Sequence, residues 1–185
     1  MSLPERKKRL PHASAALALL LAAAIVTGCQ VRPLYSDGPA AADGSSTGTT
    51  AELAAIAVKP VQTRYAQEVR NRLIFLLSGG AGQNTTPRYS LGLIVTELRE
   101  SSASIQVASE DEPTAGTLVM IATYMLKDAQ TGETVSSGKR QFSASYDIPR
   151  QEFAAERAVR DAENRAAREL AEVLKLALAQ DLARR

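Results

Sequence analysis

The segment that precedes Cys29 constrains this chain most, because it decides which residues are left to fold. A basic cluster, R-K-K-R, is followed by an uncharged apolar run at residues 13–26. This run is shorter than the roughly 20 residues that a bilayer-spanning helix needs. The letters V-T-G-C then supply a cleavage site of small residues that ends in the cysteine. We interpret residues 1–28 as a lipoprotein signal peptide, cut between Gly28 and Cys29, and expect fatty acids such as palmitate on Cys29.

The lipid decides where the protein is expected to reside. Each buried methylene contributes about 0.8 kcal/mol to membrane binding, so several acyl chains on Cys29 hold the protein firmly. The next residue is Gln30. In bacteria with two membranes, aspartate at this position generally retains lipoproteins at the inner membrane. Glutamine therefore favours a lipid anchor in the outer membrane.

Loss of the signal peptide changes the composition and excludes several kinds of active site. Of the 22 basic and 20 acidic residues, four basic residues and one acidic residue lie in residues 1–28, so 18 and 19 remain. This near-neutral balance does not favour nucleic acid as a partner. The single histidine, His12, is also lost. Without histidine or a second cysteine, no Ser-His-Asp or Cys-His site and no His/Cys zinc site can form, and the sequence indicates no cofactor. We therefore expect a protein that is not an enzyme, although a carboxylate pair or a Ser-Lys pair stays formally possible.

The mature chain divides into two parts. Residues 36–51 are small and polar, a composition typical of a flexible tether, so we assign residues 29–52 to the lipidated N-terminus and tether. Residues 53–185 are long enough for a single domain with one core.

Hydrophobic periodicity predicts an α+β domain with the order β-α-β-β-β-α. Apolar residues recur with helical spacing in two segments and alternate in the strands between them. The simplest packing places two helices on one face of a mainly antiparallel four-stranded sheet and leaves the other face open. The last helix is about 50 Å long, more than a small sheet covers, and we expect its C-terminal end to overhang. The expected elements are a strand at 53–58, a helix at 63–77, strands from 89, at 118–126 and at 139–146, a hairpin connection at 128–133 and a helix at 150–182.

The mature N-terminus resembles a known family. Residues 29–35, C-Q-V-R-P-L-Y, are similar to the opening C-G-F-R-P-L-Y of the LptE family of lipopolysaccharide-assembly lipoproteins, especially its alphaproteobacterial type. The stretch V-R-N-R-L at 69–73 and the strand opening Y-S-L at 89–91 fit the same order of elements. Gln30 and Val31 depart from the usual Gly and Phe. The first change leaves lipidation unaffected, and the second removes an aromatic side chain from this opening.

The resemblance implies a non-catalytic subunit of the outer-membrane lipopolysaccharide translocon. Proteins of this family plug a β-barrel outer-membrane partner, help it to assemble and contact lipopolysaccharide on its way to the cell surface. The expected location is the outer membrane, with the lipid-anchored protein facing the periplasm or lying within the barrel lumen. An alternative with the same signal, tether and domain size is an accessory lipoprotein of another envelope machine. A phospholipid-transport ABC system and a peptidoglycan-synthase activator are examples.

The phosphates of lipopolysaccharide point to exposed basic side chains as candidate contacts. Lys127, Lys139 and Arg140 flank the expected hairpin, and Arg88 and Arg99 lie on the preceding strand. The alternative is that basic residues at strand ends keep the sheet edges soluble. The basic residues at 64–72 are interpreted as the solvated face of the first helix.

Overall fold

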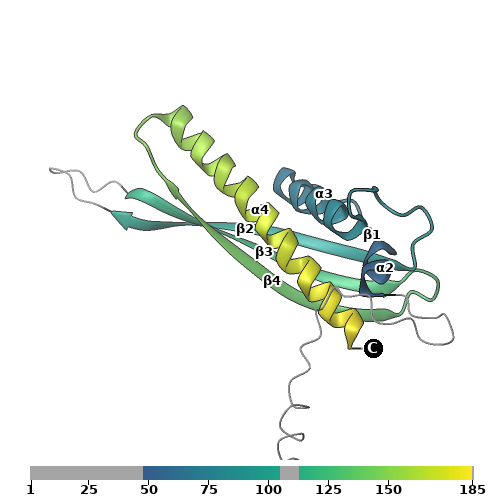
Figure 1. Cartoon of the computed structure of the whole chain (residues 1–185). Coiled ribbons are helices and arrows are strands. Elements are labelled where there is room, and N and C mark those ends of the chain that lie inside the picture. Colours follow the sequence, from purple (N-terminus) through teal and green to yellow (C-terminus); the bar gives the residue numbers. More distant parts are fainter. Residues whose placement is uncertain (1–47, 105–112, 185) are drawn as a thin grey trace, which may run out of the picture. The chain divides into compact units, whose positions relative to one another are not determined.

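The computed structural model describes residues 48–104 and 113–184. These residues form three helices and one four-stranded sheet (Figure 1). In chain order the elements are α2 (Thr49–Ala54), β1 (Ile56–Val58), α3 (Arg64–Ser78), β2 (Tyr89–Ser104), β3 (Pro113–Asp128), β4 (Thr134–Asp147) and α4 (Glu152–Ala183).

The strands lie in the order β1-β2-β3-β4, and the sheet is mixed. The short β1 runs parallel to β2 because α3 carries the chain back across the sheet between them. The long strands β2, β3 and β4 form an antiparallel meander. Gly132 has φ +73° in the turn between β3 and β4, as the expected hairpin connection requires. The predicted α+β class and element order are confirmed, with β1 as the parallel exception.

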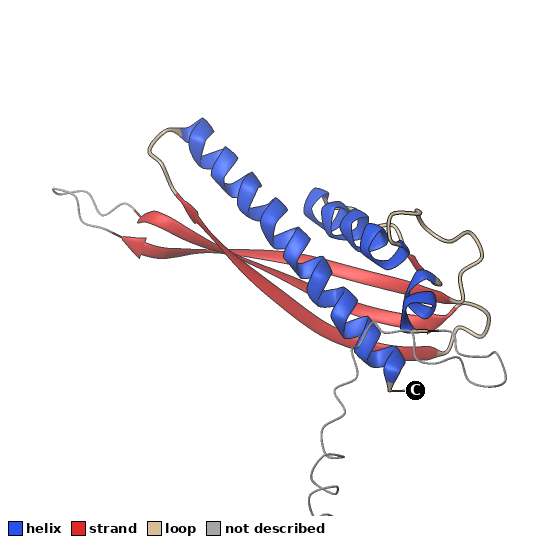
Figure 2. Ribbon diagram, in the orientation of Figure 1, coloured by secondary structure: helices blue, strands red, loops and turns tan. Residues whose placement is uncertain are grey.

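Helices α3 and α4 cover one face of the sheet (Figure 2). The core lies between these two layers, where alternate strand residues meet the inner stripes of the helices. The largest fully buried side chains come from every element except β4: Leu53, Val58, Leu73, Tyr89, Leu91, Leu118, Met120, Tyr124, Leu126, Leu170, Leu174 and Leu178.

Both ends of α3 follow from its sequence. The side chain of Thr63 accepts a hydrogen bond from the Ala66 backbone N–H, which satisfies one free donor of the first turn. Gly79 adopts φ +61° at the other end, a left-handed conformation that glycine takes without steric cost. The predicted helix at 63–77 therefore matches α3 closely.

Helix α4 overhangs at the end opposite to the one predicted. Its buried residues begin at Ala162 and continue to Ala179, so the C-terminal half lies on the sheet and on α3. The first turns are exposed, and Phe153, an apolar residue of the first turn, is 80% exposed. The physical reason is side-chain size. Alanines at 162, 166, 167 and 171 let the C-terminal half approach the sheet and α3 closely.

The N-terminal edge of the domain differs from the expected strand at 53–58. Helix α2 includes Leu53, whose side chain is buried in the core, and only Ile56–Val58 pair with β2. Residues 49–52 of the expected tether form most of α2, and residues 29–47 lie outside the described residues.

Candidate functional site: the open face of the sheet

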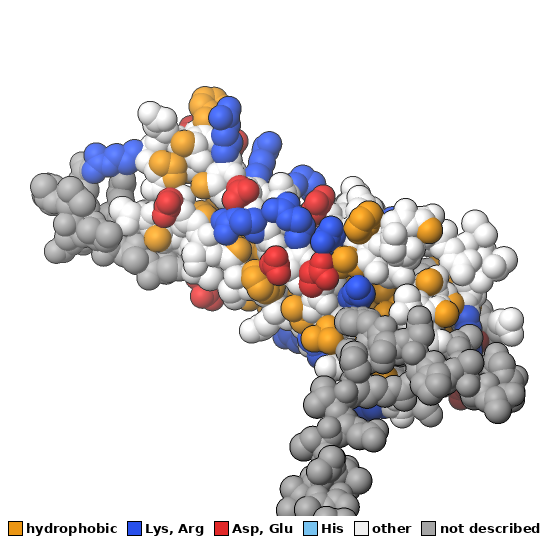
Figure 3. Space-filling view, viewed as in Figure 1, with side chains coloured by type: hydrophobic (Ala, Val, Ile, Leu, Met, Phe, Trp, Pro, Cys, Tyr) orange, Lys and Arg blue, Asp and Glu red, His pale blue; other side chains and the backbone are white. Residues whose placement is uncertain are grey.

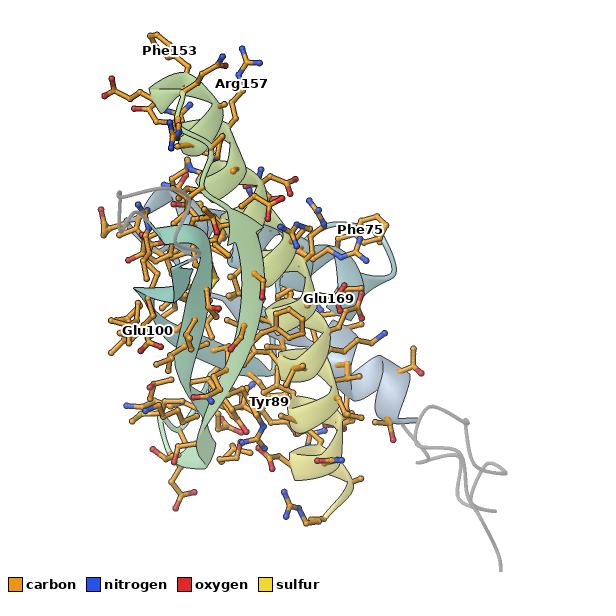
Figure 4. All side chains as sticks on the ribbon, turned by 90° about the vertical axis from the view of Figure 1, so that its left-hand side faces the viewer. Phe75, Tyr89, Glu100, Phe153, Arg157 and Glu169 are labelled. Carbon is orange, nitrogen blue, oxygen red and sulfur yellow. The ribbon has the colours of Figure 1, made fainter. Side chains whose placement is uncertain are left out.

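The sheet face away from the helices carries a row of apolar side chains. Ile94, Leu98 and Met125 are 70%, 51% and 45% exposed, and Val119 and Ile121 between them are half-buried. Their neighbours at alternate positions, such as Leu118 and Met120, are buried under the helices. Figure 4 shows the two sides, with Glu100 pointing away from the helices and Glu169 lying on α4. We call Ile94, Leu98, Val119, Ile121 and Met125 the apolar stripe.

Strand register makes the apolar stripe continuous. Leu98 lies directly across from Val119, while Ile94 and Ile121 are offset by two residues on neighbouring strands. Diagonal neighbours of this kind remain within reach of large side chains. Met125 extends the row toward the β3–β4 hairpin. From Met125 to Val119 the stripe spans about 20 Å at roughly 3.3 Å per residue.

Two of the five predicted basic contacts lie on the open face. Lys127 pairs in register with Ser90 at the hairpin end of the sheet, and Lys139 pairs with Thr123 beside the apolar stripe. About 13 Å of strand separates the two rows. Both lysines therefore border the stripe, which sequence alone could not show because they come from different strands.

The other three basic residues are already engaged elsewhere. Arg88 forms an ion pair of 2.6 Å with Glu52. Arg140 lies over the ring of Tyr124 on the helical side, 6.0 Å from its centroid. Arg99 forms a 2.7 Å ion pair with Glu163 of α4, about 30 Å from the hairpin. The structure does not bring the five residues together into one cluster.

The basic residues of α3 have structural partners rather than only solvent. Arg70 donates hydrogen bonds to the backbone carbonyls of Val58 and Lys59, at 3.1–3.2 Å, and so ties α3 to the end of β1. Arg72 forms a 2.9 Å ion pair with Glu172 of α4. The prediction of a simple solvated face was wrong for these two residues.

Glu163 is an important residue that sequence reasoning missed. Its side chain is buried and accepts hydrogen bonds from Arg64 of α3 and Arg99 of β2. These groups line a groove of about 580 Å³ together with Arg160 and Glu156. A buried carboxylate is costly unless it is paired, so this arrangement joins three elements. A glutamate within an alanine-rich inner stripe is the sequence signal that could have revealed it.

A second buried polar pair fastens the C-terminal end of α4. The Tyr124 hydroxyl donates a 2.8 Å hydrogen bond to Asp181. Burial and this bond to a carboxylate together raise the pKa of Tyr124 to about 12. Burial alone would raise the pKa of Asp181, but the hydrogen bonds from Tyr124 and Arg184 outweigh it and lower that pKa. The pair is therefore held as neutral phenol and carboxylate near neutral pH.

The helical face has a different character from the open face. Lys and Arg side chains lie along α4 with Asp and Glu among them (Figure 3). Asp161 and Arg165 form an ion pair of 2.7 Å one turn apart, a spacing at which opposite charges meet on a helix. Within residues 48–104 and 113–184, no helix has the length and apolar content needed to cross a membrane. The same residues contain no group of His, Cys, Asp and Glu arranged to hold a metal ion.

The arrangement defines a class of small α+β protein in which two helices cover one face of a four-stranded sheet and the other face stays open. A family model for LptE, described as lipopolysaccharide-assembly, matches residues 53–178. The chain belongs to the LptE family and has a role in lipopolysaccharide assembly. This confirms the resemblance that the N-terminal sequence indicated.

Solved structures share this fold. A protein described as a lipoprotein from Caulobacter crescentus is 28% identical with a TM-score of 0.60, and the match covers 73% of this chain and 96% of that chain. A minor lipoprotein from Acinetobacter baumannii is 15% identical with a TM-score of 0.50, covering 68% and 89% of the two chains. No curated protein matches.

The predicted lipidation site lies outside the described residues. Gly28 and Cys29, between which the signal peptide is expected to be cut, both precede residue 48. The sequence motif alone therefore carries this prediction.

Proposed function

We propose that this protein is an outer-membrane lipoprotein subunit of the lipopolysaccharide translocon. In this role it plugs a β-barrel partner, helps the barrel to assemble and contacts lipopolysaccharide during its insertion at the cell surface. The observation that carries the proposal is the match of the LptE family model to residues 53–178. The related Caulobacter structure, described as a lipoprotein, supports the lipid anchor on Cys29.

The charged helical face suits docking inside a barrel. The lumen of an outer-membrane barrel is polar and accepts a surface of mixed charge. Helix α4 presents such a surface, with Arg157, Arg168 and Glu169 exposed along it. In this proposal the helical face meets the barrel wall.

We also propose that the protein acts by binding and not by catalysis. The mature chain has no histidine. The buried Glu163 and Tyr124 are both engaged in contacts that hold α4 to the sheet. A structural pairing leaves neither group available as a general base.

The test is a pull-down of the full-length chain, with its signal and lipid, in a mild detergent. The proposal expects an outer-membrane β-barrel protein to co-purify, and depletion of the chain to lower the amount of lipopolysaccharide at the surface. Recovery of an ABC transporter or a peptidoglycan synthase in place of a barrel would contradict it. Labelling with a fatty-acid analogue should mark the wild-type chain and not Cys29→Ser, which tests the lipid anchor separately.

A helical-face variant tests the docking surface itself. Reversing two charges, Arg157→Glu with Arg168→Glu, should lower the yield of barrel about tenfold, because each reversal replaces an attraction with a repulsion. Lys127→Glu with Lys139→Glu reverses the same number of charges on the open face and should leave the yield unchanged. An equal loss of barrel yield in both variants would show that net charge, and not the helical face, determines barrel docking.

A further inference from the structure

We propose that the open face of the sheet binds an acyl chain of a phosphorylated amphiphile along the apolar stripe, with Lys127 and Lys139 contacting its phosphate groups. The inference rests on the proposed function, which makes a glycolipid the ligand. It adds where on the chain that ligand lies and which way it points.

The exposure of the apolar stripe is the first observation. Single exposed apolar residues are ordinary on protein surfaces, but continuous patches commonly mark binding sites. The five side chains of the stripe are continuous across β2 and β3, and three of them are 45–70% exposed. On the helical face, by contrast, large exposed apolar residues such as Phe153 and Leu176 stand far apart along α4.

The length of the stripe suits an acyl chain. One leaflet of a bilayer is about 15 Å of hydrocarbon, half of the roughly 30 Å core. The stripe runs for about 20 Å from Met125 to Val119. A single extended chain of that length therefore fits along the stripe, in contact with its apolar side chains and with Thr123, which lies between Met125 and Ile121 on the same face.

Charge decides the direction of the bound molecule. Lys127 lies at the hairpin end of the stripe and Lys139 borders its middle on β4, level with Thr123, whereas Glu100 lies beyond Leu98 at the other end. An anionic headgroup is attracted to the lysines and repelled by the glutamate. The phosphates therefore lie between Lys127 and Lys139, in the hairpin half of the sheet, and the acyl chain points toward Leu98 and Val119.

The barrel wall is a poorer occupant for this face. The lumen of a barrel is polar, so covering Ile94 and Leu98 with it would bury apolar area against hydrated groups. The mixed charges of α4 match a polar wall better. If α4 contacts the wall, the apolar stripe remains accessible to the acyl chain of the ligand.

Binding experiments with the full mature chain, purified with its lipid in a fixed concentration of mild detergent, test the inference. The probes are intact lipopolysaccharide, fully deacylated lipopolysaccharide and inorganic phosphate. Ile94→Thr with Leu98→Thr keeps β-prone residues in the strand but removes apolar area. We expect this variant to bind intact lipopolysaccharide about tenfold more weakly and the deacylated form as well as wild type does.

The matched control is Phe153→Gln with Leu176→Gln, which removes two exposed apolar side chains from α4. It should leave all binding unchanged. Lys127→Gln with Lys139→Gln should weaken both glycolipid forms severalfold, more strongly at low salt. Free phosphate should compete only weakly, because it lacks the acyl chain. Thermal unfolding of each variant, unchanged from wild type, shows that the fold is intact.

Four results would overturn the inference. The first is wild-type affinity in the Ile94→Thr, Leu98→Thr variant, and the second is an equal loss in the α4 control. The third is that the Ile94→Thr, Leu98→Thr variant no longer co-purifies with the barrel but still binds glycolipid. The fourth is absence of glycolipid binding by the wild-type chain. The barrel pull-down tests the proposed function separately, so the two failures can be told apart.

Discussion

Gly138 of β4 lies directly across from Tyr124 of β3, and the phenol ring covers the glycine. A Cβ atom at Gly138 would stand 2.7 Å from the Tyr124 hydroxyl oxygen, far inside normal contact. The ring is 2% exposed and its hydroxyl is bound to Asp181, so it has little freedom to move aside. The glycine thus lets the sheet hold the C-terminal end of α4.

Gly138→Ala is therefore expected to destabilise the protein by about 2–3 kcal/mol, as in overpacked cores. The measurement is the free energy of unfolding from denaturant titration. Gly92→Ala is the matched control in β2, where the nearest atom to a new Cβ is 3.8 Å away. That control should be neutral or slightly stabilising, because alanine loses less backbone entropy on folding. Similar losses in both variants would contradict the packing argument.

The raised pKa of Tyr124 predicts a loss of stability at alkaline pH. Above pH 10 the tyrosine ionises in the unfolded chain, while in the folded protein it stays protonated until about pH 12. The unfolded state therefore binds fewer protons in this window, and stability falls as the pH rises, by about 2 kcal/mol for this group. Tyr124→Phe should show a flatter profile between pH 10 and 12. Equal slopes for the two proteins would show that Tyr124 does not couple folding to pH.

The paired arginines around Glu163 predict non-additive mutations. Arg64→Met or Arg99→Met alone should cost less than about 1 kcal/mol, because the exposed arginine that remains still pairs with the carboxylate. Both changes together should cost about 3 kcal/mol or more, since a buried charge is left without a partner. Adding Glu163→Gln to the double variant should recover part of the loss. Strict additivity in this cycle of unfolding free energies would exclude the shared role of Glu163.

Arg70 is expected to stabilise the junction between α3 and β1. Arg70→Lys keeps the charge but loses the fork of donors to the Val58 and Lys59 carbonyls, and it should cost about 1–2 kcal/mol. Arg168→Lys, at an exposed position of α4, should change stability by less than about 0.5 kcal/mol. Hydrogen exchange of the β1 amides should quicken only in the Arg70 variant. Unchanged exchange there would show that the bond is not needed.

Local patterns were enough for several elements of the fold. Thr63 and Gly79 mark the ends of α3 because a cap and a left-handed glycine act within one turn of chain. The alternating residues of β2 and β3 and the glycine at 132 predicted the meander for the same reason. The order of elements then followed from the order of these signals along the chain.

Long-range contacts could not be read in this way. From the sequence we grouped Arg88 and Arg99 with the hairpin lysines. Strand β2 is so long that Arg99 lies far from the hairpin, where it pairs with Glu163 of α4. The overhang of α4 was assigned to the wrong end because periodicity shows which side of a helix is apolar. It does not show how far the helix slides along the sheet.

By itself the sequence predicted a lipoprotein signal, showed that no histidine follows residue 12, and indicated an α+β meander with two helices. These properties depend on neighbouring residues and on composition. Only the tertiary structure decided that Lys127 and Lys139 border one apolar stripe, and that Glu163 and Asp181 hold α4 in place. Such groupings depend on strand register and helix position, because packing brings together residues from different elements of the chain.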